Sequence, residues 1–369
     1  MLPNPPLWLT LLAFVCALGP LVFFHELGHY GVARLFKIPA ETFSIGFGKA
    51  LVSWTDRQGT QWKIGWLPLG GYVKFVGDMS PASTGLDEGL SEEDRKRAFQ
   101  LRPVWQRFLV VLAGPMANFL LAIVIFAGIL SLVSAPQTNR VGTVKADTAA
   151  SAAGIQRGDR ILSVAGRQTL TFDDVRDQVA KRPGETVRIK LDRDGEVRDL
   201  NLKVGEDTLT DATGKKVKIG LLGVSPGPIS IVRAIPLATV QTVQILGWIV
   251  EGVGKLIVGE GSREDVGGPI KIAQFAGQAA SLGPAVFFSL LALFSINLGF
   301  INLLPVPMLD GGHLFFYAVE AVRKRPLSER ALEWAFRGGL ALILALVVFT
   351  TINDLGSLGL WDRLQRLIG

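Results

Sequence analysis

Four stretches of the chain are apolar over a length that can cross a membrane. A helix needs roughly 20 mostly apolar residues to span the hydrocarbon core of a bilayer. The stretches that meet this requirement are residues 6–36, 105–133, 284–305 and 334–352. The hydrophobic pattern therefore predicts a polytopic α-helical membrane protein with four transmembrane helices.

A fifth apolar stretch, residues 235–258, is interrupted by polar side chains. Gln241, Gln244, Glu251 and Lys255 would each be costly in hydrocarbon. A helix that lies on the membrane surface can keep such residues on its polar face. We therefore expect this stretch to lie on the membrane rather than to cross it.

Two regions between the apolar stretches alternate apolar and polar residues with the period of a β-strand. Residues 137–224 contain such runs separated by glycine turns, which predicts a small, mostly β domain. Residues 49–75 alternate in the same way, with a turn at 57–59, and predict a membrane-associated β-sheet. Residues 78–97 are polar and charged, and Ser91 marks a helix start within this exposed loop.

The chain divides accordingly into seven parts. They are a first transmembrane helix (1–36), a cytoplasmic-side β-hairpin region with a loop (37–103), a second transmembrane helix (104–135), an extracytoplasmic domain (136–226), an amphipathic membrane-surface segment (227–283), a third transmembrane helix with the motif that follows it (284–322), and a basic loop with the fourth transmembrane helix and a tail (323–369).

Composition agrees with a membrane protein and excludes several other classes. Hydrophobic residues make up 49% of the chain and charged residues 19%, which is a poor fit to soluble domains. The net charge of +6 is spread along the chain without an aromatic-basic RNA motif, so we expect membrane lipid as a partner and no nucleic acid. The single cysteine, Cys16, excludes a disulfide framework and a cysteine-based zinc site.

Positive charge in the short loops predicts the orientation. Residues 34–107 and 323–330 are basic, whereas the N-terminal tail has no Lys or Arg. Basic loops stay on the cytoplasmic side, so both chain ends and the β domain are expected outside. The N-terminal tail also lacks the positive region of a secretory signal, so we expect the first helix to be retained.

The end of the first apolar stretch carries the pattern HExxH. His25 and His29 lie four residues apart, so on a helix they share one face and can bind one zinc ion. Glu26 can then take a proton from zinc-bound water, because zinc lowers the pKa of that water to about 7. The alternative is a pair of helix-end histidines that hydrogen-bond to neighbours, but ionisable groups at membrane depth are usually functional.

A zinc hydrolase of this type needs a third protein ligand and an open position for water. The stretch 302–313, at the end of the third span, offers both Asp310 and His313. Two glycines after Asp310 would let the backbone turn sharply and present the carboxylate, although the same pattern fits an ordinary turn. With four spans, this stretch lies on the same side of the membrane as His25, whereas a fifth crossing at 235–258 would separate the two by roughly 30 Å.

Five separated motifs follow one another in the order of a known protein family. The motifs are HELGH (25–29), GGYVKF (70–75), AGPMANF (113–119), GGPIKI (267–272) and NLLPVPMLDGGH (302–313). Together they cover nearly the whole chain and resemble the bacterial site-2 protease family, the zinc intramembrane metalloproteases similar to the regulator-of-sigma-E protease. The resemblance implies His25, His29 and Asp310 as zinc ligands and Glu26 as the catalytic base of a zinc metalloendopeptidase.

The resemblance also concerns the extracytoplasmic domain. Residues 141–166, with glycines at the turn positions, look like the first half of a PDZ domain, which implies an inserted PDZ-like α+β domain. Such a domain is expected to contact peptides or substrate ectodomains. Well-known members carry two tandem PDZ domains, whereas this chain has room for one. The resemblance further implies the bacterial inner membrane, with the PDZ-like domain in the periplasm.

The family resemblance implies transmembrane proteins as substrates, already shortened by another protease; anti-sigma factors and remnant signal peptides are two types. A transmembrane helix hides its peptide bonds, so it must unwind, and a strand edge can hold the unwound segment. The resemblance places that edge at Gly70, Gly71, Tyr72 and Val73, although an ordinary hairpin turn also fits these residues.

The break after the third span offers two further candidates. Pro305 cannot continue a helix without losing a hydrogen bond, so it would free backbone and widen the site. Asn302 matches a family position that suggests binding of substrate backbone, or it caps the helix. Asn118 in the second span could do likewise, but a hydrogen bond between helices is the preferred interpretation.

Two functions of other classes compete with the protease. A catalytically silent scaffold would use the PDZ-like domain to hold partners and would bind no zinc. A zinc transporter would need ionisable residues along several spans. The second and fourth spans have no such residue at their centres, which disfavours transport.

Overall fold

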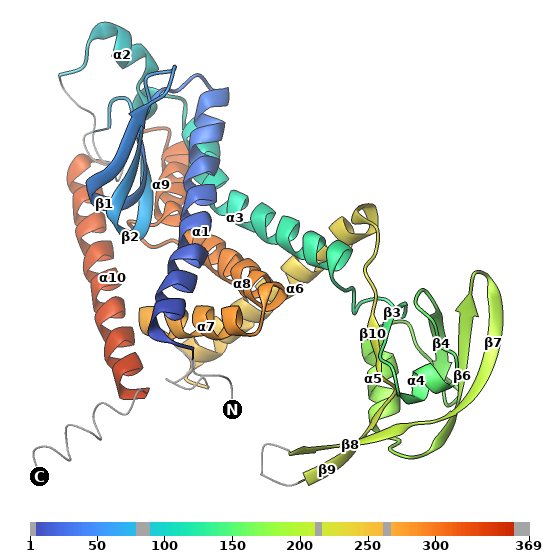
Figure 1. Cartoon of the computed structure of the whole chain (residues 1–369). Helices are drawn as coiled ribbons and strands as arrows, with labels where there is room; N and C mark the ends of the chain where they lie inside the picture. Colours follow the sequence, from blue (N-terminus) through green and yellow to red (C-terminus); the bar gives the residue numbers. More distant parts are fainter. Residues whose placement is uncertain (1–4, 79–88, 211–215, 261–266, 358–369) are drawn as a thin grey trace, which may run out of the picture. The chain divides into compact units, whose positions relative to one another are not determined.

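The computed structural model describes residues 5–78, 89–210, 216–260 and 267–357. The chain forms two compact units: unit 1 combines residues 1–123 and 241–369, and unit 2 consists of residues 124–240. Figure 1 shows that unit 1 is built mainly of long helices and unit 2 mainly of strands.

The first helix of unit 1, α1 (Leu7–Leu35), is continuous over 29 residues. Apart from Glu26, its buried positions recur every four residues, at Ala13, Ala17, Leu21, His25, His29 and Ala33. Residues four apart lie on one face of a helix. The two histidines therefore continue the face through which α1 packs against the rest of unit 1.

A second long helix, α3 (Val104–Leu132), runs in the opposite direction to α1. Trp105 at its start contacts Phe36, just after the end of α1, with ring centroids 5.2 Å apart. Further along, a side chain on Gly28 would overlap the backbone of Ala113 and lie 2.8 Å from the methyl group of Ala117. Glycine at this position is what lets the two helices approach so closely.

Two long strands, β1 (Ala40–Thr55) and β2 (Gln61–Phe75), form a sheet that contacts α1. Ile45 in the first part of β1 pairs with both Gly71 and Ile64, so this part lies between two segments of β2. Within the described residues, the segment 71–75 has one paired neighbour and therefore forms an edge of the sheet. The side chain of Phe43 fixes the sheet to α1, stacking on Trp62 at 4.2 Å and meeting the ring of Tyr30 edge-on at 5.8 Å.

Four helices of unit 1 lie within the described residues 267–357. They are α7 (Pro269–Ser281), α8 (Pro284–Leu303), α9 (Asp310–Arg323) and α10 (Glu329–Ser357). α7 lies beside the start of α1, because a side chain on Gly277 would meet Thr10 at 2.6 Å. α8 begins two residues later and packs against α3, where the Ser295 hydroxyl donates to the carbonyl of Asn118 at 2.7 Å. In α10, Asp354 accepts hydrogen bonds from the first backbone amides of α7.

The motif after the third apolar stretch starts a helix of its own. α8 ends at Leu303, and Leu304 is extended (φ −63°, ψ 140°), as a residue before proline tends to be. Gly311 and Gly312 lie inside α9, and side chains there would overlap the carbonyl oxygens of residues 303, 304 and 306. The glycines were expected to make a sharp turn; they instead allow α9 to pack directly on the segment before it.

The loop predicted at 78–97 falls partly outside the described residues, which omit 79–88. Its predicted helix start is confirmed: α2 (Glu92–Arg97) begins after Ser91, whose hydroxyl accepts the backbone amide of Asp94 at 3.1 Å. A short 3₁₀ helix (Phe99–Leu101) follows and places the ring of Phe99 on that of Phe75, 4.9 Å away.

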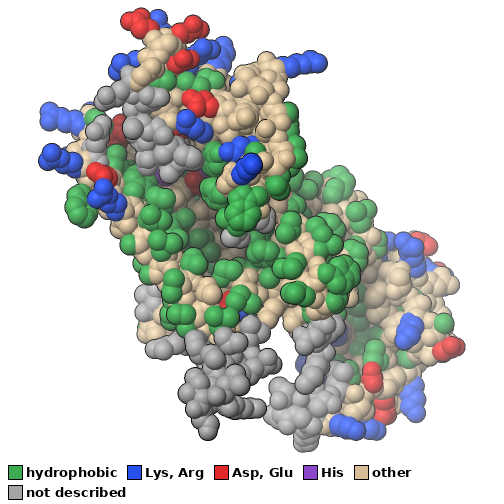
Figure 2. All heavy atoms as spheres, turned by 60° about the vertical axis from the view of Figure 1, so that its left-hand side comes forward, with side chains coloured by type: hydrophobic (Ala, Val, Ile, Leu, Met, Phe, Trp, Pro, Cys, Tyr) green, Lys and Arg blue, Asp and Glu red, His purple; other side chains and the backbone are tan. Residues whose placement is uncertain are grey.

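Five helices in the described residues are long and apolar enough to cross a membrane: α1, α3, α6 (Ile231–Val258), α8 and α10. The predicted count of four is therefore not confirmed, because α6 meets the same criteria of length and composition as the others. Figure 2 shows hydrophobic side chains over much of the middle of the face drawn, with charged side chains toward the top, where Figure 1 has α2, and again at the lower right. Such a surface suits contact with lipid.

Unit 2 is an α+β unit with a compact apolar core. A four-stranded antiparallel sheet has the order β5-β4-β6-β7, and two further pairs are β3-β10 and β8-β9. The strands are β3 (Val141–Val144), β4 (Arg160–Val164), β5 (Arg167–Gln168), β6 (Thr186–Arg193), β7 (Glu196–Lys203), β8 (Gly205–Thr210), β9 (Lys216–Leu221) and β10 (Val224–Pro226), and the helices are α4 (Ala149–Ala152) and α5 (Phe172–Ala180). Alternate residues of β6, Val187, Ile189 and Leu191, enter the core.

One buried ion pair links the strands of unit 2. Arg193 donates two hydrogen bonds to Asp159, at 2.7 and 2.8 Å, and Asp159 is 1% exposed. Burial by itself would raise the pKa of Asp159, but the hydrogen bonds from Arg193 and from the backbone of Gln156 hold it below its usual value. The carboxylate is therefore charged and fully paired at neutral pH.

Candidate metal centre

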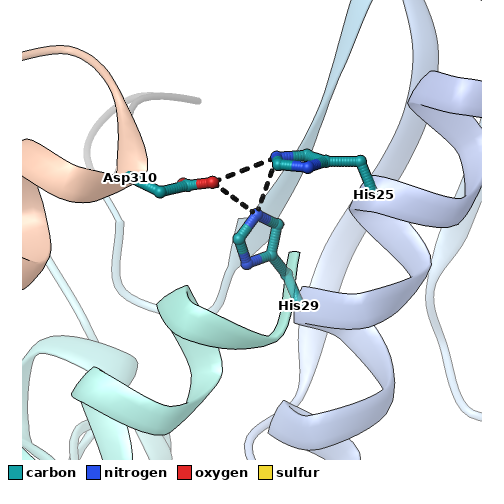
Figure 3. A group of neighbouring side chains, drawn as sticks. All are labelled: His25, His29 and Asp310. Carbon is teal, nitrogen blue, oxygen red and sulfur yellow. Dashed lines mark hydrogen bonds and ion pairs between the residues drawn. The ribbon is translucent and has the colours of Figure 1, made fainter. Parts of the chain in front are cut away.

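Three ligand atoms from two distant parts of the chain converge in unit 1 (Figure 3). His25 and His29 are one helical turn apart on α1, and their Nε2 atoms lie 3.2 Å from each other. Asp310 is the first residue of α9, and its Oδ2 lies 3.1 Å from Nε2 of His25 and 3.5 Å from Nε2 of His29. The structure thus brings together the three residues that the family resemblance suggested as ligands.

This donor set fits a shared cation. Oδ2 of Asp310 is buried without a hydrogen-bond partner among the described residues. Nδ1 of His29 lies 2.9 Å from the backbone carbonyl of Val110, which can only accept, so in the neutral ring Nδ1 carries the hydrogen and Nε2 presents a lone pair. Ligand atoms about 2.0–2.1 Å from a tetrahedral zinc ion lie roughly 3.3 Å from one another, close to the three separations found here.

Glu26 follows the first histidine and faces the sheet. It is 8% exposed, and a side chain on Gly71 would come within 3.1 Å of Cγ of Glu26 and 2.7 Å of a methyl group of Val22. The absence of a side chain at Gly71 therefore leaves the room that Glu26 occupies. The predicted catalytic base and the edge segment 71–75 lie next to each other as a result.

A cavity of about 330 Å³ opens onto these residues. Its lining includes the three ligand candidates, Glu26, Asn302, His313 and the segment 70–73. Pro305, also predicted for the site, lies just beyond the end of α8 and is not among the lining residues. His313, the alternative third ligand, lines the cavity but packs its ring against Phe336 at 5.1 Å and is not part of the group that could hold a metal.

The sequence did not predict which groups contact the Nδ1 atoms of the two histidines. Both come from α3: the carbonyl of Val110 faces Nδ1 of His29, and the side chain of Asn118 lies 3.1 Å from Nδ1 of His25. The signal for Asn118 was a polar residue within an apolar stretch, which was interpreted as a contact between helices. The residue it contacts could not be read from the pattern, because the pattern does not give the rotation of α3 against α1.

The comparison with protein families agrees with this geometry. Peptidase family M50 matches residues 13–346, a range that contains every residue of the metal centre. The chain belongs to peptidase family M50.

Full-length relatives of this M50 peptidase have been named for the same chemistry. A relative from Agrobacterium fabrum, whose name assigns it to the zinc metalloproteases, is 41% identical over 94% of this chain and 95% of its own length. One from Mesorhizobium japonicum with the same kind of name is 43% identical over 94% and 98%. Metalloprotease MmpA of Caulobacter vibrioides is 39% identical over 94% and 95%.

A solved structure resembles part of the chain. The PDZ domain of an SdrC-like protein from Listeria monocytogenes covers 24% of this chain and 87% of that domain, with 20% identity and a TM-score of 0.19. A likeness at this level carries no conclusion about unit 2.

Family membership settles the class of the protein. This M50 peptidase is a membrane protein and a zinc metalloendopeptidase of the site-2 protease type, as its sequence predicted. The prediction of zinc as cofactor is confirmed by the same findings. The scaffold and transporter alternatives lose their support.

Proposed function

We propose that this M50 peptidase hydrolyses peptide bonds within the transmembrane segments of membrane proteins, with zinc held by His25, His29 and Asp310. The observation that carries the proposal is the convergence of their three ligand atoms, beside Glu26, on a cavity at the buried face of an apolar helix. Ionisable groups at this depth are costly and are kept for function.

When bound, zinc would supply an activated water and polarise the carbonyl of the scissile bond. The chain's own residues supply the proton transfer and the positioning. The carboxylate of Glu26 takes the proton of the attacking water and passes it to the nitrogen of the leaving amine. Asn302, at the last turn of α8 and on the cavity wall, is placed to hold the substrate backbone through its side-chain amide.

The edge of the sheet is the proposed holding site for the unwound substrate. A helix in the membrane loses its internal hydrogen bonds when it unwinds, and a strand edge can replace them. The segment 71–75 forms such an edge, and Gly70, Gly71, Tyr72 and Val73 all line the cavity. A substrate strand added there would pass next to Glu26.

The proposed topology has four crossings, with α6 on the membrane surface. α3 starts beside the end of α1, whereas α7 and the start of α8 lie beside the start of α1. If α3 crosses the membrane once, the chain has already reached the side on which α8 begins. The segment from the end of α3 to the start of α8 must then begin and end on the same side of the membrane. A single crossing by α6 would put its two ends on opposite sides.

Orientation and substrates complete the proposal. From the basic loops at 34–107 and 323–330 we propose that the start of α3 lies on the cytoplasmic side of the inner membrane and unit 2 in the periplasm. There, unit 2, as a PDZ-like domain, would contact or exclude substrate ectodomains. We propose as substrates membrane proteins already shortened by another protease, such as anti-sigma factors or remnant signal peptides.

The test is cleavage of a co-expressed single-span substrate by a Glu26→Gln variant. Loss of a general base costs about 10²–10⁴-fold in rate, so cleavage should fall to that extent while protein level and bound zinc persist. Glu251→Gln, on the exposed face of α6, is the matched control and should cleave normally. Undiminished cleavage by Glu26→Gln would rule out the proposed mechanism.

A further inference from the structure

The two histidine ligands differ in the group that hydrogen-bonds to Nδ1, the ring nitrogen that faces away from the metal position. For His29, the backbone carbonyl of Val110 lies 2.9 Å from Nδ1 and can only accept a hydrogen bond. For His25, the side-chain amide of Asn118 lies 3.1 Å from Nδ1, and an amide can either donate or accept. The tautomer of His29 is therefore set by backbone, whereas that of His25 depends on one side chain.

The amide of Asn118 has two orientations with opposite consequences. With its nitrogen toward His25, the amide donates to Nδ1, and the ring hydrogen of the neutral imidazole then sits on Nε2, where it blocks the lone pair needed by a metal. Half a turn of the amide places Oδ1 there instead. Nδ1 then carries the hydrogen and donates it to Asn118, and the lone pair of Nε2 faces Asp310.

The surroundings of Asn118 show that its oxygen lacks a partner. The residue is 0% exposed, and its Oδ1 has no hydrogen-bond partner among the described residues. A buried amide oxygen without a hydrogen-bond partner destabilises the folded protein. Turning the amide gives this oxygen the N–H of His25 to accept, so the same motion pairs Oδ1 and prepares His25 to bind a metal.

Packing holds Asn118 at this place. Asn118 and Val110 are two helical turns apart on α3 and so share the face that meets α1. Gly28 brings the helices close, because its missing side chain makes room for Ala113 and Ala117. Ser295 on α8 donates to the backbone carbonyl of Asn118 at 2.7 Å, so this bond does not occupy the side chain that contacts His25.

We propose that Asn118 is a positioning residue of the metal centre: its carbonyl oxygen accepts the Nδ1 hydrogen of His25 and so fixes the tautomer in which Nε2 can bind zinc. This inference rests on the ligand set of the proposed function. Partners of this kind typically contribute 10–100-fold to metal affinity. A bond that served only to join α1 and α3 would contribute to stability but not to the choice of tautomer.

The test compares zinc retention in three variants of the purified full chain. Asn118→Leu keeps the size of the side chain but removes the acceptor, and should lose zinc to a chelator at about 10–100-fold lower chelator concentration than wild type. Asn118→Asp keeps an oxygen acceptor and should restore retention. Ser295→Ala removes the neighbouring bond between helices without touching His25, and should retain zinc as the wild type does.

A spectroscopic measurement separates tautomer from folding. In the zinc-loaded protein labelled with ¹⁵N at histidine, His25 should show its hydrogen on Nδ1 in the wild type and in Asn118→Asp. If the Asn118→Leu variant retains zinc as well as the wild type does, the role proposed for Asn118 is wrong, but the ligand set stands. If the wild type itself binds no zinc, both the ligand set and the role of Asn118 are wrong.

If Asn118→Leu fails to fold, Asn118→Asp decides alone. Retention and the Nδ1 hydrogen in that variant support the proposal, because a carboxylate can only accept. Loss of zinc from a folded Asn118→Asp variant contradicts it.

Discussion

Two buried asparagines, one in each unit, show how differently the two units use polar groups. In unit 2, Asn139 donates to the carbonyls of Ile161 and Thr169 at 2.8 and 2.9 Å, and thereby joins two strands of the core. In unit 1, the side chain of Asn118 contacts His25 through its nitrogen, and its oxygen is left without a partner among the described residues. The hydrogen bonds of Asn139 stabilise unit 2. The oxygen of Asn118 gains a hydrogen bond only when His25 carries its hydrogen on Nδ1.

The same contrast holds for the buried carboxylates. Asp159 of unit 2 receives two hydrogen bonds from Arg193 and one from the backbone. Asp310 of unit 1 faces two imidazole nitrogens, and within the described part of the chain its Oδ2 has no hydrogen-bond partner. A buried charge without a partner is expensive unless a cation completes it. In these two comparisons, the polar groups at the metal centre lack a hydrogen-bond partner among the described residues, whereas Asn139 and Asp159 of unit 2 have theirs.

The largest expected effect concerns the close approach of α1 and α3. Gly28→Ala would force the helices apart at Ala113, which shifts the histidines relative to their partners on α3. A displacement of about 1 Å can cost 10²-fold in rate, so cleavage should fall at least that far, with weaker zinc binding. Gly31→Ala on the same helix has open space around it and should leave both unchanged. Normal cleavage by Gly28→Ala would show that the approach is not required.

A smaller effect is expected from breaking the ion pair of unit 2. Asp159→Asn leaves Arg193 without its charged partner, which should destabilise unit 2 by about 3 kcal/mol. Hydrogen exchange of the β4 and β6 amides in the full chain measures this as roughly a hundredfold loss of protection. Zinc binding should not change. The control is Asp199→Asn, in an exposed pair with Arg188, which should alter protection by less than about twofold. Equal effects of the two variants would show that the buried pair contributes no more than the exposed one.

The smallest effect is a pH dependence of the same pair. Because the hydrogen bonds from Arg193 outweigh burial and lower the pKa of Asp159, its stabilisation is complete above the unfolded value of about 4 and is lost as pH falls through the lower folded pKa. Protection of β4, corrected for the intrinsic rate of exchange, should therefore decrease below about pH 4. Asp159→Asn should lack this step. An identical decrease in the variant would assign the effect to other groups.

The sequence predicts the features that depend on local spacing. Four residues between His25 and His29 place both on one face of a helix, and continuous apolar runs predict the long helices of unit 1. Alternation predicts the strands of unit 2, such as β6. The motif order identifies the family, and the family comparison confirms it. The helices, the strands and the shared face of the two histidines follow from the repeat of the helix or strand alone.

Features that depend on packing could not be predicted in the same way. The contact between Asn118 and His25 needs the rotation of α3 against α1, which small residues permit but do not define. The reason for the glycines after Asp310 appears only when α9 is seen against the segment before it. α6 fits both a surface helix and a crossing by composition, because its polar residues are few and its length is sufficient.

The central claim is that two stretches of chain nearly three hundred residues apart hold one zinc ion within the membrane-embedded part of the protein. Zinc stoichiometry of the purified wild type beside Asp310→Ala measures this most directly, with Asp199→Ala as a control for the loss of a carboxylate. The account predicts one zinc per chain in the wild type and the control and a large loss in Asp310→Ala. Stoichiometric zinc in Asp310→Ala, or none in the wild type, would contradict it.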